Sequence, residues 1–321
     1  MHDIKAIREN PQGFDAGLAR RGVVAAAGKI LQVDAERRMA VQHAEVGQAR
    51  RKVLSQYFGT LKAKGDAIPP ELTAELESLK NAPASDDQNV ALLTATLDLM
   101  LKGEPNLPAN DVPDGAEETD NIIVHERGTV PVFNFQPSDH ADFATRLGLD
   151  FESAQAVSGA RFAYLRGDIA RLSRGLGQFM LDVHITESGY QEVTPPLLVR
   201  SDAMYGTGQL PKFADDSFET TDGRWLIPTA EVSLTNLVRE QILSEEELPL
   251  RFVALTPCFR SEAGAAGKDT RGLIRQHQFD KVELVSITTP ETSDGERGRI
   301  DRKSTRLNSS HRNTSRMPSS A

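Results

Sequence analysis

The sequence has few of the features that mark secreted or membrane proteins. Cys258 is the only cysteine among 321 residues, which excludes an internal disulfide and fits a reducing compartment. No run of eighteen apolar residues occurs, so no segment is expected to span a membrane. The first residues, MHDIKAIREN, are charged and lack the apolar stretch of a secretion signal. We therefore expect a cytoplasmic protein without a membrane partner.

The sequence also lacks clustered Cys and His ligands, so no metal-binding residues are predicted. The net charge of −9 argues weakly against a protein that coats nucleic acid. Charge is nevertheless unevenly distributed, because residues 29–64 hold eight Lys or Arg against three acids, whereas residues 66–102 hold two Lys against seven acids. The basic segment can meet a polyanion on one face.

Apolar or small residues in residues 30–100 follow a 3-4 spacing on two consecutive segments. This spacing predicts two helices that share a heptad seam. KGDAIPP, between the segments, is expected to end one helix and start the other, which gives an antiparallel helical hairpin. Pro83 should kink the returning helix. A dimerisation coiled coil and an arm that offers its basic helix to a nucleic acid both fit this pattern. The seam positions are Ile30, Val33, Ala40, Ala44, Gly47, Leu54, Phe58, Leu61, Leu72, Leu76, Leu79, Val90, Leu93, Leu97 and Met100, with Arg37, Arg51, Pro83 and Asp86 in the remaining slots.

Four regions follow from this pattern. Residues 1–102 form the helical arm, and the Pro-rich, acidic residues 103–121 form a linker. Residues 122–294 form a second domain, and residues 295–321 are expected to be a disordered, non-native tail rich in Ser, Arg, Asn and Thr. Residues 301–311 and 315–321 can be encoded by two consecutive parts of a common short-read sequencing adapter. We therefore expect the natural gene to continue beyond this point.

The second domain mixes helices with short strands, which predicts an α+β fold with an antiparallel sheet. A helix is expected after Asp168, with Ile169, Leu172, Leu176, Phe179 and Val183 on one face, and Gly189 is expected to stop it. YQEVTPPLLV predicts an edge strand, because Pro195 and Pro196 cannot donate to a ladder. Further strands are expected at RWLIP, LRFVALTPCF and FDKVELVSI.

Three arginines surround the flexible segment between the last two strands, TPCFRSEAGAAGKDTRGLIRQHQF. A strand, loop, strand arrangement with Arg260, Arg271 and Arg275 can bring guanidinium groups together on a phosphate. The alternative is a surface hairpin whose arginines pair with local acids. His277 is expected to be a hydrogen-bonding support, and Cys258 a buried small residue.

A second candidate cluster lies in IPTAEVSLTNLV, residues 227–238. Pro228 and Thr229 open a helix, and Glu231 lies in its first turn. Either Glu231 caps the helix dipole, or its carboxylate faces a pocket and accepts an ammonium group.

FRSEAGAAGKDTRGLIRQHQF resembles motif 2 of class II aminoacyl-tRNA synthetases, in the form found in seryl-tRNA synthetases. TGQLPKF (residues 207–213), the TAE of residues 229–231, the HDIKAIREN start and the arm with its NLP…VP linker resemble the same family. The likeness extends over residues 1–292. TAE and the absence of clustered Cys/His ligands are typical of the bacterial type. The proline pair resembles the motif 1 region, which the family uses at its dimer interface.

The resemblance implies an ATP site and a serine site. It gives ATP contacts to Arg260, Ser261, Glu262, Arg275 and Phe279, with Arg260 and Arg275 as the catalytic arginines. It gives L-serine contacts to Thr229, Ala230, Glu231 and Glu283. The role of Arg271 stays open, because it can also contact the tRNA end.

The family performs ATP-dependent activation of L-serine to seryl-adenylate with Mg²⁺, and transfers serine to tRNA(Ser) and tRNA(Sec). The resemblance thus implies a homodimeric serine–tRNA ligase that holds tRNA with its arm. The family's third motif is absent from the sequence, which predicts an incomplete catalytic domain and an inactive polypeptide. The alternatives are a non-catalytic tRNA-binding or dimerising paralogue and a synthetase for another amino acid.

Overall fold

The computed structural model describes residues 2–64, 67–81, 83–115, 118–126, 129, 131–262, 271–307 and 313–316. The chain divides into two compact units, Met1–Glu126 with Asn313–Ala321, and Arg127–Arg312. The first is mainly helical and the second mixes helices and sheet, which confirms the predicted α+β class. Within the described ranges, no helix is both long and apolar enough to cross a bilayer.

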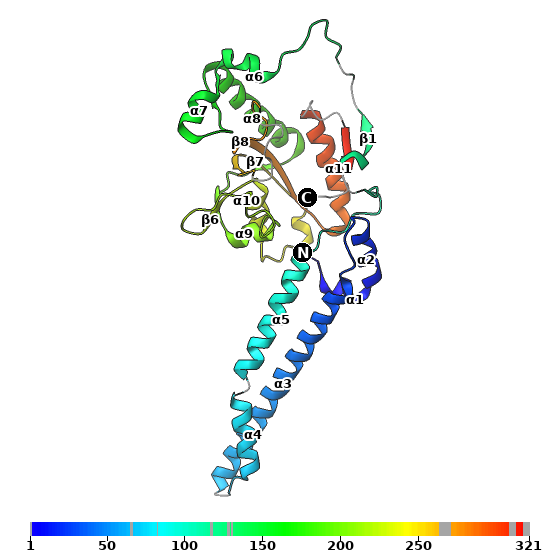
Figure 1. Cartoon of the computed structure of the whole chain (residues 1–321), viewed down its shortest axis with the longest axis vertical. Coiled ribbons are helices and arrows are strands. Elements are labelled where there is room, and N and C mark those ends of the chain that lie inside the picture. Colours follow the sequence, from blue (N-terminus) through cyan, green and yellow to red (C-terminus); the bar gives the residue numbers. More distant parts are fainter. Residues whose placement is uncertain are drawn as a thin grey trace. The chain divides into compact units, whose positions relative to one another are not determined.

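A helical hairpin makes up most of the first unit (Figure 1). α3 (Ala27–Lys64) runs out, and α4 (Pro70–Asn81) and α5 (Pro83–Gly103) return beside it. α4 ends at Asn81 and α5 begins at Pro83; Ala82 lies outside the described residues, so the kink expected at Pro83 stays a prediction. Every predicted seam position whose burial is described is buried or half-buried, including Arg37 and Arg51 in the apolar slots. The heptad seam is therefore confirmed.

Two short helices close the base of the hairpin. α1 (Ile4–Glu9) and α2 (Pro11–Ala19) pack on the start of α3 and the end of α5 through a buried apolar cluster. Beside this cluster, the buried carboxylate of Asp34 accepts hydrogen bonds from Arg8 at 2.8 and 2.9 Å. Arg37 and Arg38 lie 3.5 and 3.3 Å from the same carboxylate. The Arg8 hydrogen bonds in particular lower the pKa of Asp34.

The predicted linker does not hang free of the first unit. Arg20 donates to the Asp114 carboxylate at 2.7 Å and to the Ala109 carbonyl at 3.1 Å, and Arg21 donates to the Asn106 carbonyl at 3.0 Å. η1 (Glu118–Asp120) and β1 (Ile122–Glu126) follow, and β1 pairs antiparallel with β9 (Asn313–Arg316). These contacts place the end of the first unit at Glu126, later than the predicted boundary at residue 121.

The second unit is organised around a three-stranded sheet in the order β4 (Gln191–Glu192), β7 (Leu250–Phe259), β8 (Gln278–Ile287). β7 and β8 are antiparallel over ten residues each, whereas β4 is parallel to β7. The predicted YQEVTPPLLV strand divides into β4, at the sheet edge, and β5 (Leu198–Arg200). The division falls at the two prolines, because neither can donate a ladder hydrogen bond. β5 pairs with β6 (Arg224–Leu226), and β2 (Leu149–Asp150) pairs with β3 (Tyr164–Leu165).

α8 (Gly167–Ser188) covers one face of this sheet and ends at Gly189, whose φ of 66° is left-handed as predicted. The five apolar residues that were predicted to share one face of this helix are at most partly buried. Leu172, Leu176 and Phe179 are each about half exposed, at 55%, 50% and 56%, and the helix instead turns the side that contains Gly177 inward. A Cβ at Gly177 would lie 3.1 Å from Leu255 Cδ2 of β7, so the helix packs through its smallest residue. The remaining short helices are α6 (His140–Phe143), η2 (Ala144–Leu147), α7 (Phe151–Ser158), α9 (Ser201–Gly206), α10 (Glu231–Thr235), η3 (Asn236–Val238) and η4 (Glu245–Glu247).

The last helix, α11 (Pro290–Leu307), contradicts the disorder predicted from residue 295. Glu296 is 9% exposed and accepts hydrogen bonds from Arg251 at 2.8 and 3.1 Å and from Ser286 at 3.0 Å. Arg299, one turn along, donates to the same carboxylate at 2.6 Å. These contacts tie α11 to β7 and β8. The non-native origin of the final residues stays a prediction.

The Glu296 network gives a prediction for stability. Hydrogen bonds from Arg251 and Arg299 lower the pKa of Glu296 to about 2. Because the pKa is depressed on folding, the stabilisation is complete above the unfolded-state value and is lost as pH falls from about 5 to 2. We expect Glu296→Gln to cost about 2–3 kcal/mol at pH 7 and clearly less at pH 3.

Urea unfolding followed by the fluorescence of Trp225, the single tryptophan, which is buried in this unit, measures the effect. Asp294→Asn is the matched control, since its pair with Arg297 lies on the exposed side of the same helix and should contribute little. An equal cost of Glu296→Gln at both pH values would contradict the assignment.

Candidate active site

The register of β7 and β8 determines which side chains share the site. Ala254, Thr256 and Cys258 of β7 lie opposite Glu283, Lys281 and Phe279 of β8, respectively. Because alternate residues of a strand point to the same side, the three β8 residues line one face of the sheet. Their three β7 partners lie beside them on the same face and are buried.

A hydroxyl, an ammonium and a carboxylate meet on this face. Thr229 Oγ1 donates to Glu283 Oε2 at 2.5 Å, and Lys281 Nζ donates to Thr229 Oγ1 at 3.0 Å. Lys281 also forms an ion pair with Glu283 Oε2. Thr229 is buried and precedes the fully buried Ala230, so the segment before α10 is fixed against the sheet. Two sequence-predicted serine contacts, Thr229 and Glu283, are thus in direct contact.

Glu231 begins α10 beside this cluster. Its pKa is raised, first by partial burial and then by the nearby Glu283 carboxylate, and Lys281 opposes the rise. The residue is still accessible to solvent, so water weakens these effects. Its backbone N–H donates to Thr229 Oγ1 at 3.4 Å. The arrangement is a pair of acids with one internal cation between them.

Arg260 continues the same face beyond the end of β7. Its guanidinium lies 5.3 Å from the centre of the Phe279 ring, and its Nε donates to the Pro228 carbonyl at 3.3 Å. His277 pairs with the Arg260 backbone at both ends, which confirms its predicted supporting role. Cys258 is fully buried as predicted, and burial raises the pKa of its thiol. The thiol therefore stays protonated at neutral pH.

The other two arginines pair with acids. Arg275 Nη1 lies 3.3 Å from Glu262 Oε2, and Arg271 forms an ion pair with Asp142 of α6. Arg271 and Arg275 thus follow the second alternative from the sequence, in which the arginines of the hairpin pair with nearby acids. Of the three, only Arg260 has no ion-pair partner among the described residues. The loop glycines Gly264 and Gly267 lie outside the described residues.

Ser261 and Glu262 are held by neighbouring segments. Ser261 donates from its backbone to the Asp216 carbonyl at 2.8 Å and from its hydroxyl to the Asp215 carbonyl. Arg161 donates to the Glu262 carbonyl at 3.1 Å, and its own carbonyl accepts the His277 N–H at 3.0 Å. Arg161, Glu262 and Arg275 all have positive φ, at 63°, 50° and 53°. Such backbone strain is typical of functional sites.

A cavity of about 510 Å³ adjoins Phe279. Phe162, Tyr164 and Leu273 supply apolar walls, and Gln276 contributes a side chain that is 6% exposed. The Gln276 amide donates to the Gly272 carbonyl, but its Oε1 has no partner among the described residues. The volume suits a small ligand with an aromatic ring.

Sequence reasoning missed Lys281 and Arg161. Lys281 had a usable signal, because it lies midway between Phe279 and Glu283 on a strand where alternate residues share a face. No sequence pattern pointed to Arg161, because it lies more than 100 residues before Glu262 and His277, which it contacts.

The basic segment of the arm contains fewer free cations than its charge suggests. Arg37 and Arg38 bind Asp34, and Arg50 donates to Glu75 at 2.7 and 3.0 Å. Arg51 is half-buried in the seam. The exposed basic residues with no ion pair among the described residues are Lys29, Lys52, Lys62 and Lys64.

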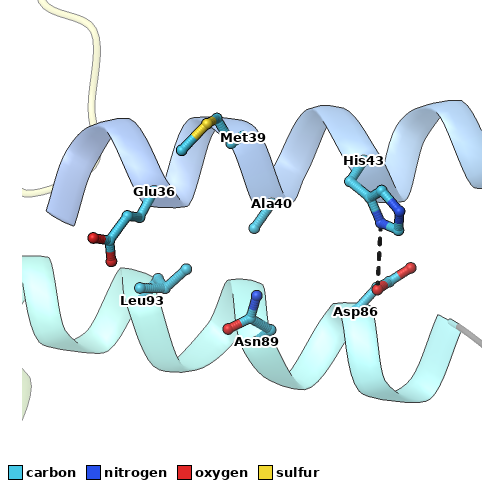
Figure 2. A pocket seen from close by; sticks show the side chains of 7 residues that line it. All are labelled: Glu36, Met39, Ala40, His43, Asp86, Asn89 and Leu93. Atoms are coloured by element: carbon cyan, nitrogen blue, oxygen red, sulfur yellow. Dashed lines mark ion pairs between the residues drawn. The ribbon is translucent and has the colours of Figure 1, made fainter. Parts of the chain in front are cut away.

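A groove of about 410 Å³ lies between α3 and α5 (Figure 2). Glu36, Met39 and His43 line it from α3, and Asp86 and Asn89 from α5. His43 lies 3.6 Å from Asp86. The two carboxylates make this groove unsuitable for phosphate.

Two family models match the chain. The Seryl-tRNA synthetase N-terminal domain matches residues 1–108, and the tRNA synthetase class II core domain (G, H, P, S and T) matches residues 216–302. The first match covers the helical hairpin, and the second covers β7, β8 and most of α11.

Known relatives cover nearly the whole chain. A serine–tRNA ligase of Rhizorhabdus wittichii is 60% identical over 92% of this chain and 69% of its own length, and one of Novosphingobium aromaticivorans is 56% identical over 94% and 71%. A seryl-tRNA synthetase of Pyrococcus horikoshii, solved with ATP, has a TM-score of 0.86 and 32% identity over 96% of this chain and 74% of its own. A cytoplasmic serine–tRNA ligase of Naegleria fowleri, solved with AMP, shares the fold with a TM-score of 0.78 at 24% identity, over 95% and 75%. The chain belongs to the seryl-tRNA synthetase family of class II aminoacyl-tRNA synthetases.

Proposed function

We propose that this protein binds ATP and L-serine on the β7–β8 face, forms seryl-adenylate and transfers serine to tRNA(Ser) and tRNA(Sec) in the cytoplasm. One observation carries the proposal. Arg260 has no ion-pair partner among the described residues and lies over the Phe279 ring. On the same sheet face lie the Thr229 hydroxyl and the carboxylates of Glu231 and Glu283, which suit an amino acid. Charged groups for a nucleotide and for an ammonium thus lie along one surface.

The ATP half of the site centres on Arg260 and Phe279. Arg260 has no acidic partner among the described residues, so its fork is available for the α-phosphate. Phe279 offers a ring for the adenine, next to the cavity of about 510 Å³. Ser261 and Glu262 belong to the same contact set. Arg275 must break its ion pair with Glu262 before it can bind the β- and γ-phosphates. The ATP complex of the Pyrococcus horikoshii relative supports this assignment.

The serine half consists of Thr229, Ala230, Glu231 and Glu283. The two carboxylates accept the substrate ammonium, while the buried Thr229–Ala230 segment fixes the floor of the site. The serine carboxylate then lies toward Arg260. One of its oxygens attacks the α-phosphorus, a P–O bond forms, and the bond to the bridging oxygen breaks to release pyrophosphate. No covalent enzyme intermediate is needed, because positioning and charge neutralisation supply the catalysis.

Mg²⁺ belongs to the proposal only as a companion of ATP. Among the described residues, no three His, Cys, Asp or Glu side chains gather into a metal site. Mg²⁺ commonly retains water and binds substrate phosphates, so it would arrive with the triphosphate. When bound, it would neutralise phosphate charge.

The chain spans 69% and 71% of the length of the two serine–tRNA ligases named above, so turnover does not by itself test the site. Its ligand affinities are therefore the measurements that test the site. They also separate the proposed enzyme from a non-catalytic paralogue, which should have no serine affinity.

Arg260→Lys tests the ATP assignment. We expect ATP affinity to fall about tenfold or more, since lysine cannot reproduce the planar fork. Isothermal titration with ATP measures the change. Arg271→Lys is the matched control. Arg271 is paired with Asp142, so its replacement should leave ATP affinity within about twofold. Equal losses in both variants would contradict the assignment of Arg260.

For tRNA(Ser), we propose the basic side of the arm as the contact surface. The family model that covers residues 1–108 supports a role for this unit in the family's function. Arg50 and Arg51 belong to the basic segment, but neither is a free cation. Arg50 is instead committed to Glu75 and Arg51 to the seam, so reversing either charge would also disturb the hairpin. Lys52 and Lys62 are exposed, lie on one side of α3 and test the surface without that complication.

We expect the double variant Lys52→Glu, Lys62→Glu to weaken tRNA binding. The slope of log affinity against log salt concentration should become shallower by about 1–2, because binding with fewer phosphate contacts releases fewer counterions. Filter binding at several salt concentrations measures the slope. Lys5→Glu on α1 makes the same type of charge change away from the hairpin and should leave the slope unchanged. An unaltered slope in the double variant would exclude this surface.

We also propose that the full enzyme is a homodimer and that α8 lies in its interface. Leu172, Leu176 and Phe179 form an apolar stripe that the described residues leave half exposed. Leu176→Asp should therefore shift the protein to monomer in sedimentation velocity without lowering its helix content. Leu147→Asp, at another exposed leucine, should not. A Leu176→Asp variant that still dimerises would rule out this face.

A further inference from the structure

Lys281 is the one charged side chain of the site face to which the proposed reaction gives no task. Its ammonium contacts both Thr229 Oγ1 and Glu283 Oε2, and its side chain is 32% exposed. It thus occupies the kind of position, between a hydroxyl and a carboxylate, in which a substrate ammonium would bind. The question is what an internal cation does in a site built to bind another one.

The charges around the site give the first part of the answer. Glu231 of α10 and Glu283 of β8 are the acids, Lys281 of β8 is the cation between them, and Arg260 stands beyond the end of β7. Cys258 of β7 is neutral because burial raises the pKa of its thiol. Without Lys281, the charge of Glu283 would act on the neighbouring Glu231 without the described cation that opposes it before serine binds. Like charges at short range favour protonation of one partner.

The geometry gives the second part. Thr229 and Lys281 both approach the same oxygen of Glu283, Oε2. Among the residues that the structure describes, none donates a hydrogen bond to Oε1. The carboxylate is therefore held from one side and retains an acceptor on the other. A carboxylate fixed in this way loses less side-chain freedom when a ligand binds.

We propose that Lys281 is a positioning residue of the amino-acid site, which anchors Glu283 through Oε2 and by its charge keeps Glu231 and Glu283 both available to one substrate ammonium. This inference rests on the proposed serine site. A purely structural ion pair would affect serine affinity equally at every pH. The proposed role makes the charge of Lys281 most important for serine affinity at low pH, where one of the two acids would otherwise bind a proton.

L-Serine affinity, measured by isothermal titration at pH 6 and pH 8.5, tests the inference in the full chain. In Lys281→Met the acids lose their cation, so one of them binds a proton more readily and the site loses affinity as pH falls. We expect about tenfold weaker binding at pH 6 and less than about threefold at pH 8.5. Lys281→Arg restores the charge and should stay within about threefold of the wild type at both pH values.

The other outcomes each decide the matter. A loss in Lys281→Met that is equal at the two pH values, or no loss, would overturn the inference, since a structural pair predicts no dependence on pH. If Lys281→Met fails to fold by circular dichroism, Lys281→Gln against Lys281→Arg makes the same comparison. Lys212→Met, at an exposed lysine of the same unit, should bind serine normally. A wild type that binds no serine at either pH would remove the proposed function, and the inference with it.

Discussion

Ten residues of β7 pair with ten residues of β8, and this pairing determines which side chains can act together. It brings Phe279, Lys281 and Glu283 onto one face, beside their buried β7 partners. A slip of one residue would turn all three to the opposite side. The loop between the strands then starts and ends where Arg260 and His277 bond to each other's backbone, which fixes the first arginine beside the Phe279 ring. The nucleotide and amino-acid halves of the proposed site thus depend on the same hairpin.

Local sequence patterns predicted helices and strands well where one hydrophobic repeat, or one residue that ends a helix, dominates the segment. Such signals predicted the heptad seam of the arm, the left-handed Gly189 and the limits of β7. The family resemblance assigned Thr229 and Glu283 to the same serine site, and the structure brings them into contact although 54 residues separate them. No local rule brings such positions together.

The failures have physical causes that lie in tertiary packing. The apolar side of α8 points outward because Gly177 allows the opposite side to approach Leu255 more closely. The expected tail is helical at its start because Glu296 finds Arg251 and Ser286 on the sheet. Composition suggested disorder, but these two hydrogen-bonding partners from the sheet outweigh composition. The sequence alone also leaves open which arginines are paired, whereas the fold pairs Arg50, Arg271 and Arg275 with acids.

The central claim is that one sheet face holds a nucleotide and an amino acid side by side. The affinity of a non-hydrolysable seryl-adenylate mimic, a seryl sulfamoyl adenosine, tests it most directly by calorimetry on the full chain. The account predicts binding much tighter than that of either ATP or serine alone, because one molecule then engages both halves without a second loss of translational freedom. A mimic that binds no more tightly than the better of its two parts would contradict the claim.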